Sequence, residues 1–327
     1  MVKIMKITEI SNYLLSEIQK GNIKSALIFS HHRPDGDTIG SATALSMALT
    51  LLGVENKIVC DGFVPTKYKF LKCSDNYVYP HQVTKKYDVH ISVDCSVESM
   101  FGDAYSLYIS NKNTINIDHH ISNSRYASKN YVENTGACCE ILYEFIKLLN
   151  VTINADIATS LMTGIVTDTG NFSHSNVTNN TMKIACELFS IGASLHVITK
   201  NVFNTQSKER AKLYAKVISN MRYLLDGKMT VLVITLNDIK EANGDVSMTE
   251  GFIDFALSID TCEVAVSILQ INDKSYKISF RSKGKVNVNE VASLYGGGGH
   301  ILASGAMMNG YLEDIIDKLA YNVKQRL

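Results

Sequence analysis

The chain has 327 residues, 46% of them apolar, and its basic and acidic side chains balance to a formal net charge of zero. This length suits one large domain or two ordinary ones, and the composition excludes a globally disordered chain. Zero net charge argues against a protein that holds long nucleic acid through its overall field, although a local basic patch is still allowed.

The seven cysteines predict a reducing compartment. They form no CxxC pair and their number is odd, so we expect neither a disulfide framework nor a zinc knuckle, and we expect a cytoplasmic protein. The first residues, MVKIMKITEISNYLLSEIQKG, read as an amphipathic helix without the apolar run of a signal peptide. No run of about 18 or more apolar residues predicts a membrane span or a membrane partner.

Strand and helix patterns alternate through the first half of the chain. Short apolar runs predict buried strands at 25–30, 56–62, 87–94 and 113–118. Helices are expected at 37–53, where Gly53 ends the helix, and at roughly 137–150 and 154–167. Strands that alternate with helices predict a mostly parallel sheet covered by helices on both faces.

The second half of the chain has a different texture. Residues 178–221 read as successive helices, and alternating strands follow at 228–236, 262–272 and 275–282, with two short helical segments after the first of them. We therefore expect an α/β protein with an N-terminal catalytic domain at 1–190, a helical linker at 191–222 and a smaller C-terminal α/β domain at 223–327.

Acidic and histidine side chains gather where the predicted strands end. HHRPDGD follows the strand 25–30, and two further clusters close the strands 87–94 and 113–118. A fourth candidate lies in MTGIVTDTGNF, where a helix of small residues meets a glycine turn. The ends of parallel strands meet at one edge, where ligands bind. The side chains expected there are His31, Asp35, Asp37, Asp94, Asp118, His119, His120 and Asp168.

Five carboxylates in one cleft repel one another unless cations balance them. Carboxylates suit Mg²⁺ or Mn²⁺, whereas imidazole favours later metals, so the mixture predicts Mn²⁺ first, with Mg²⁺, Fe²⁺ and Co²⁺ as alternatives. Two metals about 3.5–4 Å apart that share a bridging carboxylate hydrolyse phosphate esters.

Each residue has an ordinary explanation when it is taken alone. An aspartate after a strand is usually a turn residue or a helix N-cap, and Asp37 before TIGSATAL fits that role. The pair His119–His120 is also weak by itself. The four clusters at matching strand ends are what chance does not readily produce, and they favour the metal centre.

The segments HHRPDGD, VDCS, DHH and TGIVTDTGNF, in this order, resemble the four motifs of the DHH phosphoesterase family. The resemblance implies that Asp94 bridges two metals. It implies one metal on His31, Asp35 and Asp94, and a second metal on Asp37, Asp94, His119 and Asp168. It places Asp118 and His120 near the scissile phosphate, so that the implied catalytic residues are Asp94, Asp118 and His120.

The segment SFRSKGKVNVNEVASLYGGGGHILASGA raises a separate question, because ending the helix expected at 288–295 needs one glycine rather than four. A glycine run lets backbone N–H groups approach an anion or a flat base, and Arg281 suits bidentate contact with a phosphate. The segment resembles the GGGH region of the C-terminal domain that accompanies one branch of the family. The resemblance implies that the nucleotide end of a substrate is held by Arg281, Ser282, Gly297, Gly298, Gly299 and His300.

Within that branch, the chain is similar to the nanoRNases. The resemblance implies a Mn²⁺-dependent hydrolase that cuts short RNA oligonucleotides to mononucleotides and converts adenosine 3′,5′-bisphosphate (pAp) to AMP. Hydrolysis of cyclic di-AMP or its linear product pApA is the first alternative. A pyrophosphatase or exopolyphosphatase and a non-catalytic nucleotide sensor are the others, and a homodimer is one assembly considered.

Overall fold

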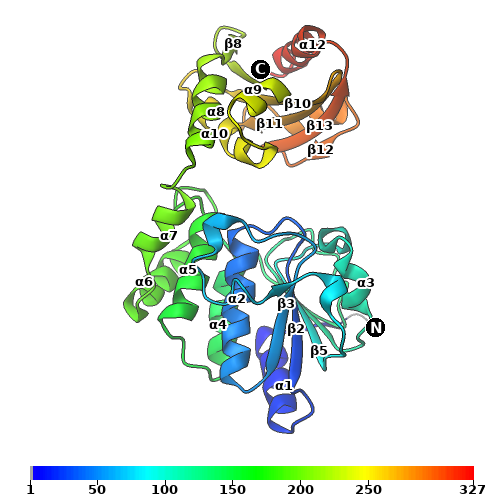
Figure 1. Ribbon diagram of the computed structural model, residues 1–327, viewed down its shortest axis with the longest axis vertical. Helices are drawn as coiled ribbons and strands as arrows, with labels where there is room; N and C mark the ends of the chain where they lie inside the picture. The colour runs from blue at the N-terminus through cyan, green and yellow to red at the C-terminus, as the bar shows by residue number, and fades with distance from the viewer. Residues whose placement is uncertain (1–2) are drawn as a thin grey trace. The chain divides into compact units, whose positions relative to one another are not determined.

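The computed structural model describes residues 3–327 and divides into two compact units, the first ending at Thr205 and the second spanning Gln206–Leu327 (Figure 1). The division falls within the stretch 191–222. The helix before the division belongs to the first unit, and the helix after it to the second. The separate linker drawn from the sequence remains a prediction.

The first unit is built on a sheet of seven parallel strands in the order β1-β7-β6-β5-β2-β3-β4. The strands are β1 (Lys3–Ile4), β2 (Ser25–Phe29), β3 (Glu55–Val59), β4 (Tyr77–Val78), β5 (Val89–Val93), β6 (Thr114–Asp118) and β7 (Lys129–Val132). The chain runs outward from β2 to β4, returns to place β5 on the other side of β2, and then runs outward again. This reversal gives the sheet a topological switch point between β2 and β5.

Helices cover both faces of this sheet (Figure 1). They are α1 (Ile7–Gln19), α2 (Gly36–Leu51), α3 (Ala104–Ile109), α4 (Cys138–Leu148), α5 (Ala155–Asp168), α6 (Asn179–Ile191) and α7 (Leu195–Val202). Side chains alternate along a strand. Ala26 and Ile28 of β2 therefore pack with α1, α2, α4 and α5, while Leu27 and Phe29 pack with Tyr108 of α3. The α/β architecture expected from the sequence is confirmed.

The second unit carries a six-stranded sheet in the order β12-β13-β11-β10-β9-β8, in which only β9 and β10 are parallel. Its strands are β8 (Arg222–Leu224), β9 (Met229–Ile234), β10 (Val264–Asn272), β11 (Ser275–Ser282), β12 (Gly298–Gly299) and β13 (Ala303–Asn309). This is the smaller second α/β domain that the alternating strands predicted.

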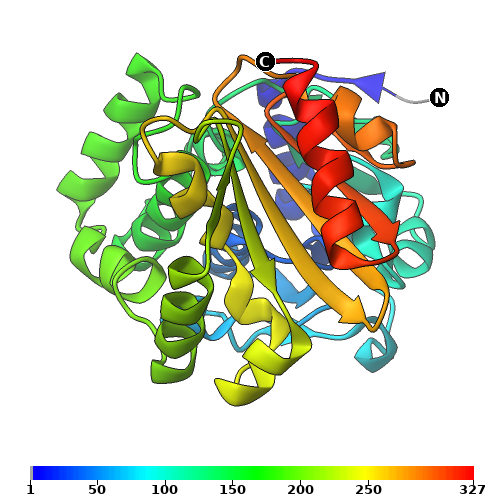
Figure 2. The same cartoon turned by 90° about the horizontal axis from the view of Figure 1, so that it is seen from above.

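The helices of the second unit also divide between the two faces of its sheet. They are α8 (Lys208–Ser219), α9 (Leu236–Glu241), α10 (Phe252–Ser258), α11 (Val288–Ser293) and α12 (Leu312–Lys324). One apolar cluster joins α8, α9 and α10 to the sheet, and another joins α11 and α12 to it. Figure 2 shows α12, in red, lying across the strands. Among residues 3–327 no single helix is long and apolar enough to span a bilayer, and α6 with α7 meets that test only as a pair bent by 111°.

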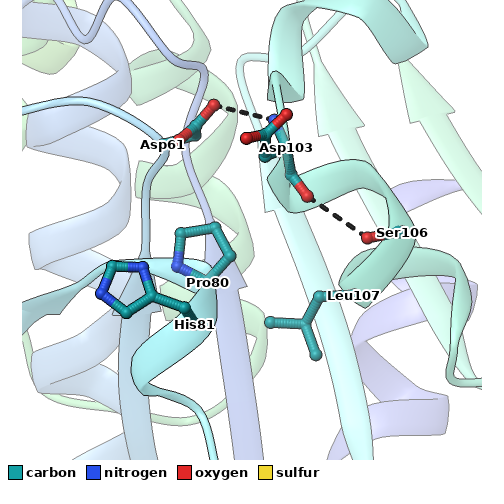
Figure 3. A pocket seen from close by; sticks show the side chains of 6 residues that line it. All are labelled: Asp61, Pro80, His81, Asp103, Ser106 and Leu107. Atoms are coloured by element: carbon teal, nitrogen blue, oxygen red, sulfur yellow. Dashed lines mark hydrogen bonds between the residues drawn. The ribbon is translucent and has the colours of Figure 1, made fainter.

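A surface cavity of about 450 Å³ lies beside β3 and β4 in the first unit (Figure 3). Asp61, which follows β3, lines it together with Pro80 and His81 of the 3₁₀ turn η2 (Pro80–Gln82). Asp103 precedes α3 and completes the lining with Ser106 and Leu107 of that helix.

Candidate metal centre

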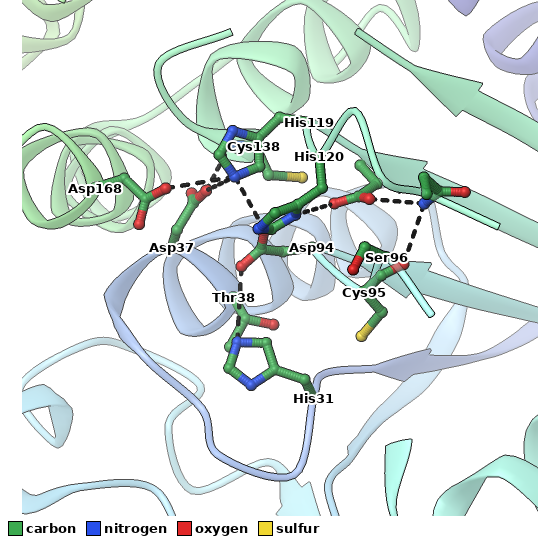
Figure 4. Close-up of polar contacts among 12 residues, drawn as sticks. His31, Asp37, Thr38, Asp94, Cys95, Ser96, His119, His120, Cys138 and Asp168 are labelled. Atoms are coloured by element: carbon green, nitrogen blue, oxygen red, sulfur yellow. Dashed lines mark hydrogen bonds and ion pairs between the residues drawn. The ribbon is translucent and has the colours of Figure 1, made fainter. Parts of the chain in front are cut away.

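The clustered acidic and histidine side chains lie at the switch point of the first sheet. His31 follows β2, Asp94 follows β5, and these two strands are parallel neighbours. His119 follows β6, the next strand beyond β5. Ligands of open α/β sheets bind at the carboxyl ends of the strands, where the strand order reverses. The structure brings the strand-end residues together there, as Figure 4 shows.

Asp94 occupies the middle of the cluster. Its backbone has φ 57°, a left-handed conformation that is uncommon for residues other than glycine, and its N–H donates to the carbonyl oxygen of Ile117. Only 2% of the residue is exposed. One carboxylate oxygen, Oδ2, lies 3.8 Å from His31 Nε2, and the other, Oδ1, lies 3.4 Å from His119 Nε2. A single carboxylate therefore faces two separate sets of ligand atoms.

Three groups of side chains have the spacing that a metal ion needs. Within each group the donor atoms lie within 4.8 Å of one another. The groups are His31, Asp35 and Asp94; Asp37, His119 and Asp168; and Asp94, His119 and His120. The protein therefore has a candidate metal site of mixed carboxylate and imidazole character, and the role of each residue as a ligand remains a prediction.

The start of α2 explains how two nearby aspartates serve different purposes. Asp35, rather than Asp37, is the N-cap, and its side chain accepts the backbone N–H groups of Asp37 and Thr38. Asp37 lies inside the helix and is fully buried. Its carboxylate accepts the N–H groups of Cys138 at 2.5 Å and Cys139 at 3.0 Å, at the start of α4. The first turn of α4 thus holds Asp37 in place.

Small residues let α5 approach this buried carboxylate. A Cβ atom placed on Gly164 would lie 2.3 Å from Cys139 Sγ and 2.5 Å from Asp37 Oδ1, so no side chain fits there. The close approach carries Asp168, the last residue of α5, to 3.4 Å from His119 Nε2. Asp168 therefore reaches the cluster from a helix end, as the glycine-containing turn in the sequence predicted.

The two adjacent histidines are held differently. The Nδ1 atom of His119 lies 3.1 Å from the carbonyl oxygen of Thr135. A carbonyl only accepts, so Nδ1 carries the proton and Nε2 presents a lone pair to the cluster. His120 uses Nδ1 to contact Asp118 Oδ1 at 2.8 Å, and the other oxygen of Asp118 accepts from Asn123 at 2.6 Å. Both oxygens of Asp118 are thus occupied, which makes Asp118 a positioning residue for His120.

The electrostatics of the cluster favour a cation. Burial raises the pKa of Asp94 well above its usual range, and the charge of Asp37 raises it further. Burial also raises the pKa of Asp168 to about 8, with Asp37 and Asp35 adding to the effect. For His119 burial acts in the opposite sense, but the carboxylates of Asp94, Asp37 and Asp168 outweigh it and raise its pKa to about 11. In the metal-free protein these carboxylates therefore compete for protons.

Two buried atoms test whether the residues suit a metal. Asp94 Oδ1 and His119 Nε2 are both buried and have no hydrogen-bond partner among the described residues. A buried polar atom without a partner is costly, and a bound cation satisfies both atoms at once. The donor set of imidazole nitrogen and carboxylate oxygen fits a divalent ion, so the residues present fit the expected group.

Sequence reasoning missed the residues that hold the ligands in place. Cys138 and Cys139 were interpreted as small core residues, yet their backbone N–H groups bind Asp37. Asn123 and the carbonyl of Thr135 were not singled out, although they position Asp118 and His119. These are contacts of backbone atoms or of an ordinary asparagine, and only the polar residues after DHH hint at Asn123.

In the second unit, the residues predicted to bind substrate lie around the hairpin 298–305. Arg281 of β11 pairs in register with Ala303 of β13, and His300 donates its backbone N–H to the carbonyl of Ala303. The guanidinium of Arg281 is 40% exposed and lies 4.0 Å from Asp254. Ser282 alternates to the opposite face of β11, where it is buried and its Oγ accepts the N–H of Gly284. The structure thus separates the side chain of Ser282 from that of Arg281.

The glycine run has structural reasons at three of its four positions. Gly296 has φ 70° just after α11, which suits a helix end. A Cβ on Gly297 would lie 2.1 Å from the carbonyl oxygen of Gly305, and Gly299 has φ 149°. Only Gly298 has room for a side chain without backbone strain. The N–H groups of Gly296 and Gly297 already bond to the end of α11, so a role for the run in binding substrate remains a prediction.

Comparison with known proteins matches both units. Residues 25–165 match the model of the DHH family, N-terminal domain, and residues 226–325 match that of the DHHA1 domain. The bifunctional oligoribonuclease and PAP phosphatase NrnA of Thermus thermophilus is 30% identical over 318 residues, which cover 96% of this chain and 94% of that protein. The protein of the same name from Bacillus subtilis is 27% identical over 293 residues, 88% of this chain and 90% of that protein.

A solved structure shares the whole fold. The crystal structure of an exopolyphosphatase-related protein from Bacteroides fragilis superposes with a TM-score of 0.89 at 23% identity, covering 96% of this chain and 95% of that chain. The similarity therefore extends over both units. With the family models and the Thermus relative, it leads to one conclusion: the chain belongs to the DHH family.

Proposed function

We propose that the protein is a metal-dependent phosphoesterase that hydrolyses short oligoribonucleotides to mononucleotides and pAp to AMP. The observation that carries the proposal is Asp94, whose two oxygens face His31 and His119 from the middle of the cluster. The names of the Thermus and Bacillus relatives, which match the chain over nearly its whole length, support the two substrate classes. The first unit is catalytic, and the DHHA1 unit holds the nucleotide end of the substrate.

The proposed cofactor is a pair of divalent cations, with Mn²⁺ preferred. The cations bind to the six side chains that the motifs assign, His31, Asp35, Asp37, Asp94, His119 and Asp168. When bound, two such ions generate a nucleophile from water at neutral pH and stabilise charge on phosphoryl oxygens. Mixed imidazole and carboxylate donors favour Mn²⁺ over Mg²⁺, and Fe²⁺ and Co²⁺ are alternatives that metal analysis distinguishes.

The remaining side chains position the substrate and move protons. Asp118 accepts a hydrogen bond from His120 Nδ1, which leaves Nε2 of His120 directed away from that contact. Asn123 fixes Asp118 from the other side. His120 can therefore contact a phosphate oxygen or give a proton to the departing hydroxyl, within reach of Asp94 Oδ1 at 3.6 Å.

Substrate length gives the direct test of this function. With Mn²⁺ we expect turnover to be greatest for di- to pentanucleotides, to fall steeply for longer strands, and to release mononucleotides one at a time. Proteins that bind long single strands use basic grooves with aromatic platforms, whereas this chain has zero net charge and no tryptophan. Time courses on labelled RNAs from two to about twenty-four nucleotides measure the dependence, a range that exceeds the roughly 4–16-nucleotide sites of single-strand binders.

The same assay compares the alternatives. The panel includes pAp, pApA, cyclic di-AMP and pyrophosphate, and the products are separated by chromatography. Faster hydrolysis of cyclic di-AMP or pyrophosphate than of short RNA and pAp would replace the proposed substrate. Equal or faster degradation of the longest RNA would indicate a processive exonuclease instead.

A second prediction concerns the division of labour between the units. We expect Arg281→Ala to raise KM for nucleotide substrates about tenfold or more, because a hydrogen bond to a charged group contributes roughly 1.5–3 kcal/mol. We expect His300→Ala to weaken turnover of the same substrates. Neither change should alter Mn²⁺ binding measured by calorimetric titration, because the candidate metal ligands all lie in the first unit.

Lys318→Ala is the matched control for these two variants. Lys318 is an exposed cation on α12, which packs on the face of the second sheet opposite to α8, α9 and α10. It should leave KM unchanged. A large loss of Mn²⁺ affinity in Arg281→Ala or His300→Ala would mean that these residues act at the metal centre rather than on the nucleotide.

A further inference from the structure

The cavity lined by Asp61, Pro80, His81, Asp103, Ser106 and Leu107 begins beside the metal centre. In the parallel register of β2, β3 and β4, Phe29 pairs with Val59, and Val59 pairs with Val78. Two residues further along each strand, His31, Asp61 and Pro80 therefore follow one another across the carboxyl edge of the sheet. Neighbouring strands are about 4.8 Å apart. The cavity thus starts roughly one strand spacing from a candidate metal ligand, within the reach of one nucleotide.

The walls of the cavity suit a flat ligand. The ring of His81 and the side chain of Leu107 stand on opposite sides of it, with Pro80 between them (Figure 3). The ring of Tyr79 lies nearly parallel to that of His81, with centroids 5.6 Å apart and an interplanar angle of 13°. Tyr79 does not line the cavity, so it supports the ring of His81 from behind. Stacked aromatic rings that end at an open cavity are typical of sites that bind nucleobases.

The polar end of the cavity carries hydrogen-bond acceptors. Asp61 is tied down, because its Oδ2 accepts the backbone N–H of Asp103 at 2.8 Å. The exposed carboxylate of Asp103 has no hydrogen bond or ion pair with any described residue, and it does not cap α3. Two carboxylates repel a phosphate, so the base of a nucleotide, rather than its phosphate, suits this cavity.

We propose that this cavity binds the base of a nucleotide adjacent to the scissile phosphate and that Asp103 selects guanine there. Guanine offers two neighbouring donors, its N1–H and its 2-amino group, which match the two oxygens of one carboxylate. Adenine, cytosine and uracil each place an acceptor beside the donor, and a carboxylate repels that acceptor. The inference rests on the proposed function, because it assumes that a phosphodiester is cut at the metal centre.

The test compares four 5′-phosphorylated dinucleotides, pGpG, pApA, pGpA and pApG, in the presence of Mn²⁺. We expect guanine at one of the two positions to raise kcat/KM about tenfold over adenine at that position, since a bidentate pair typically discriminates by roughly 1–3 kcal/mol. In Asp103→Asn the ratio should fall to near one, because an amide presents one acceptor where the carboxylate presents two. The ratio is measured within each preparation, so changes in active fraction do not affect it.

Asp75→Asn is the matched control. Asp75 is an exposed aspartate that precedes β4, at the opposite end of the strand from His81. The variant removes the same charge from the same unit, and its guanine ratio should stay near ten. In a separate arm, His81→Ala should raise KM for all four dinucleotides by about tenfold through lost stacking, and His81→Phe should restore it.

The outcomes separate this inference from the proposed function. If none of the dinucleotides is hydrolysed, the proposed function fails. If they are hydrolysed without a preference for guanine, or if the preference survives in Asp103→Asn, the assignment of the cavity is wrong while the function stands. A KM that does not change in His81→Ala also overturns the assignment.

Discussion

Asp94→Asn is expected to lower kcat/KM for pAp and for short RNA by more than about 100-fold, because even the outer partners of metal ligands contribute 10–100-fold. Asn is the informative replacement. It tolerates the left-handed backbone conformation that Asp94 adopts at φ 57°, which strains most other residues. Its amide keeps the shape of the side chain but removes the negative charge that two cations would share. Product separation measures turnover, and calorimetric titration measures the number of Mn²⁺ ions bound.

Thermal unfolding separates loss of the metal from loss of the fold. Asp94 lies among carboxylates that raise its pKa, so removing its charge should not lower the stability of the metal-free protein. We expect wild type, but not Asp94→Asn, to gain a large increase in Tm when Mn²⁺ is added. Asp94→Glu keeps the charge but moves it, and it should also lose activity. If Asp94→Asn keeps more than a tenth of wild-type turnover and binds the same number of ions, the bridging role is wrong.

Gly164→Ala is expected to be the second most damaging substitution, although alanine is normally the better helix former by about 1 kcal/mol. Here the added Cβ would lie 2.3 Å from Cys139 Sγ and 2.5 Å from Asp37 Oδ1. Overpacking of this kind costs typically 1–3 kcal/mol, which outweighs the gain in helix propensity. The displaced atoms include a candidate metal ligand, and a shift of about 1 Å at such a site can cost 100-fold in rate. Chemical denaturation and steady-state kinetics measure the two effects.

A second substitution provides the control. Cys139→Ala removes the sulfur that the new methyl group meets first, so the double variant should lose less stability than the sum of the two single variants. The contact with Asp37 remains in the double variant, and we therefore expect its turnover to stay low. Wild-type Mn²⁺ affinity in Gly164→Ala would show that the close packing of α5 does not control the position of Asp37.

The sequence predicted the parts of the fold that have strong patterns. Continuous apolar runs marked β2, β5 and β6, because strands buried on both faces carry no polar residues in alternation. The polar residues that follow these runs marked the edge where His31, Asp94 and His119 meet. The strand expected at 56–62 ends earlier, at Val59, and its last residues instead form one wall of the cavity. Local patterns thus located the site without its supports.

The remaining features depend on contacts between distant segments. The short strands β1, β4 and β7 form by pairing at or near the sheet edge rather than by their own hydrophobic pattern, so the sequence did not predict them. Which of Asp35 and Asp37 caps α2 depends on where α4 begins. Three glycines of the run 296–299 are required by β13 and by turn geometry, which no local rule distinguishes from a ligand cradle.

The location of the metal centre also gives the cation a role in how the chain matures. The candidate ligands span residues 31 to 168 and come from four separate loops or helix ends. No shorter piece of the chain contains a full set, so tight binding arises only after α5 has been made and packed. A ligand held only by the folded state adds stability in proportion to the logarithm of its concentration, about 2.7 kcal/mol at a hundred times its Kd. The lifetime of the folded protein is thereby tied to the supply of divalent metal.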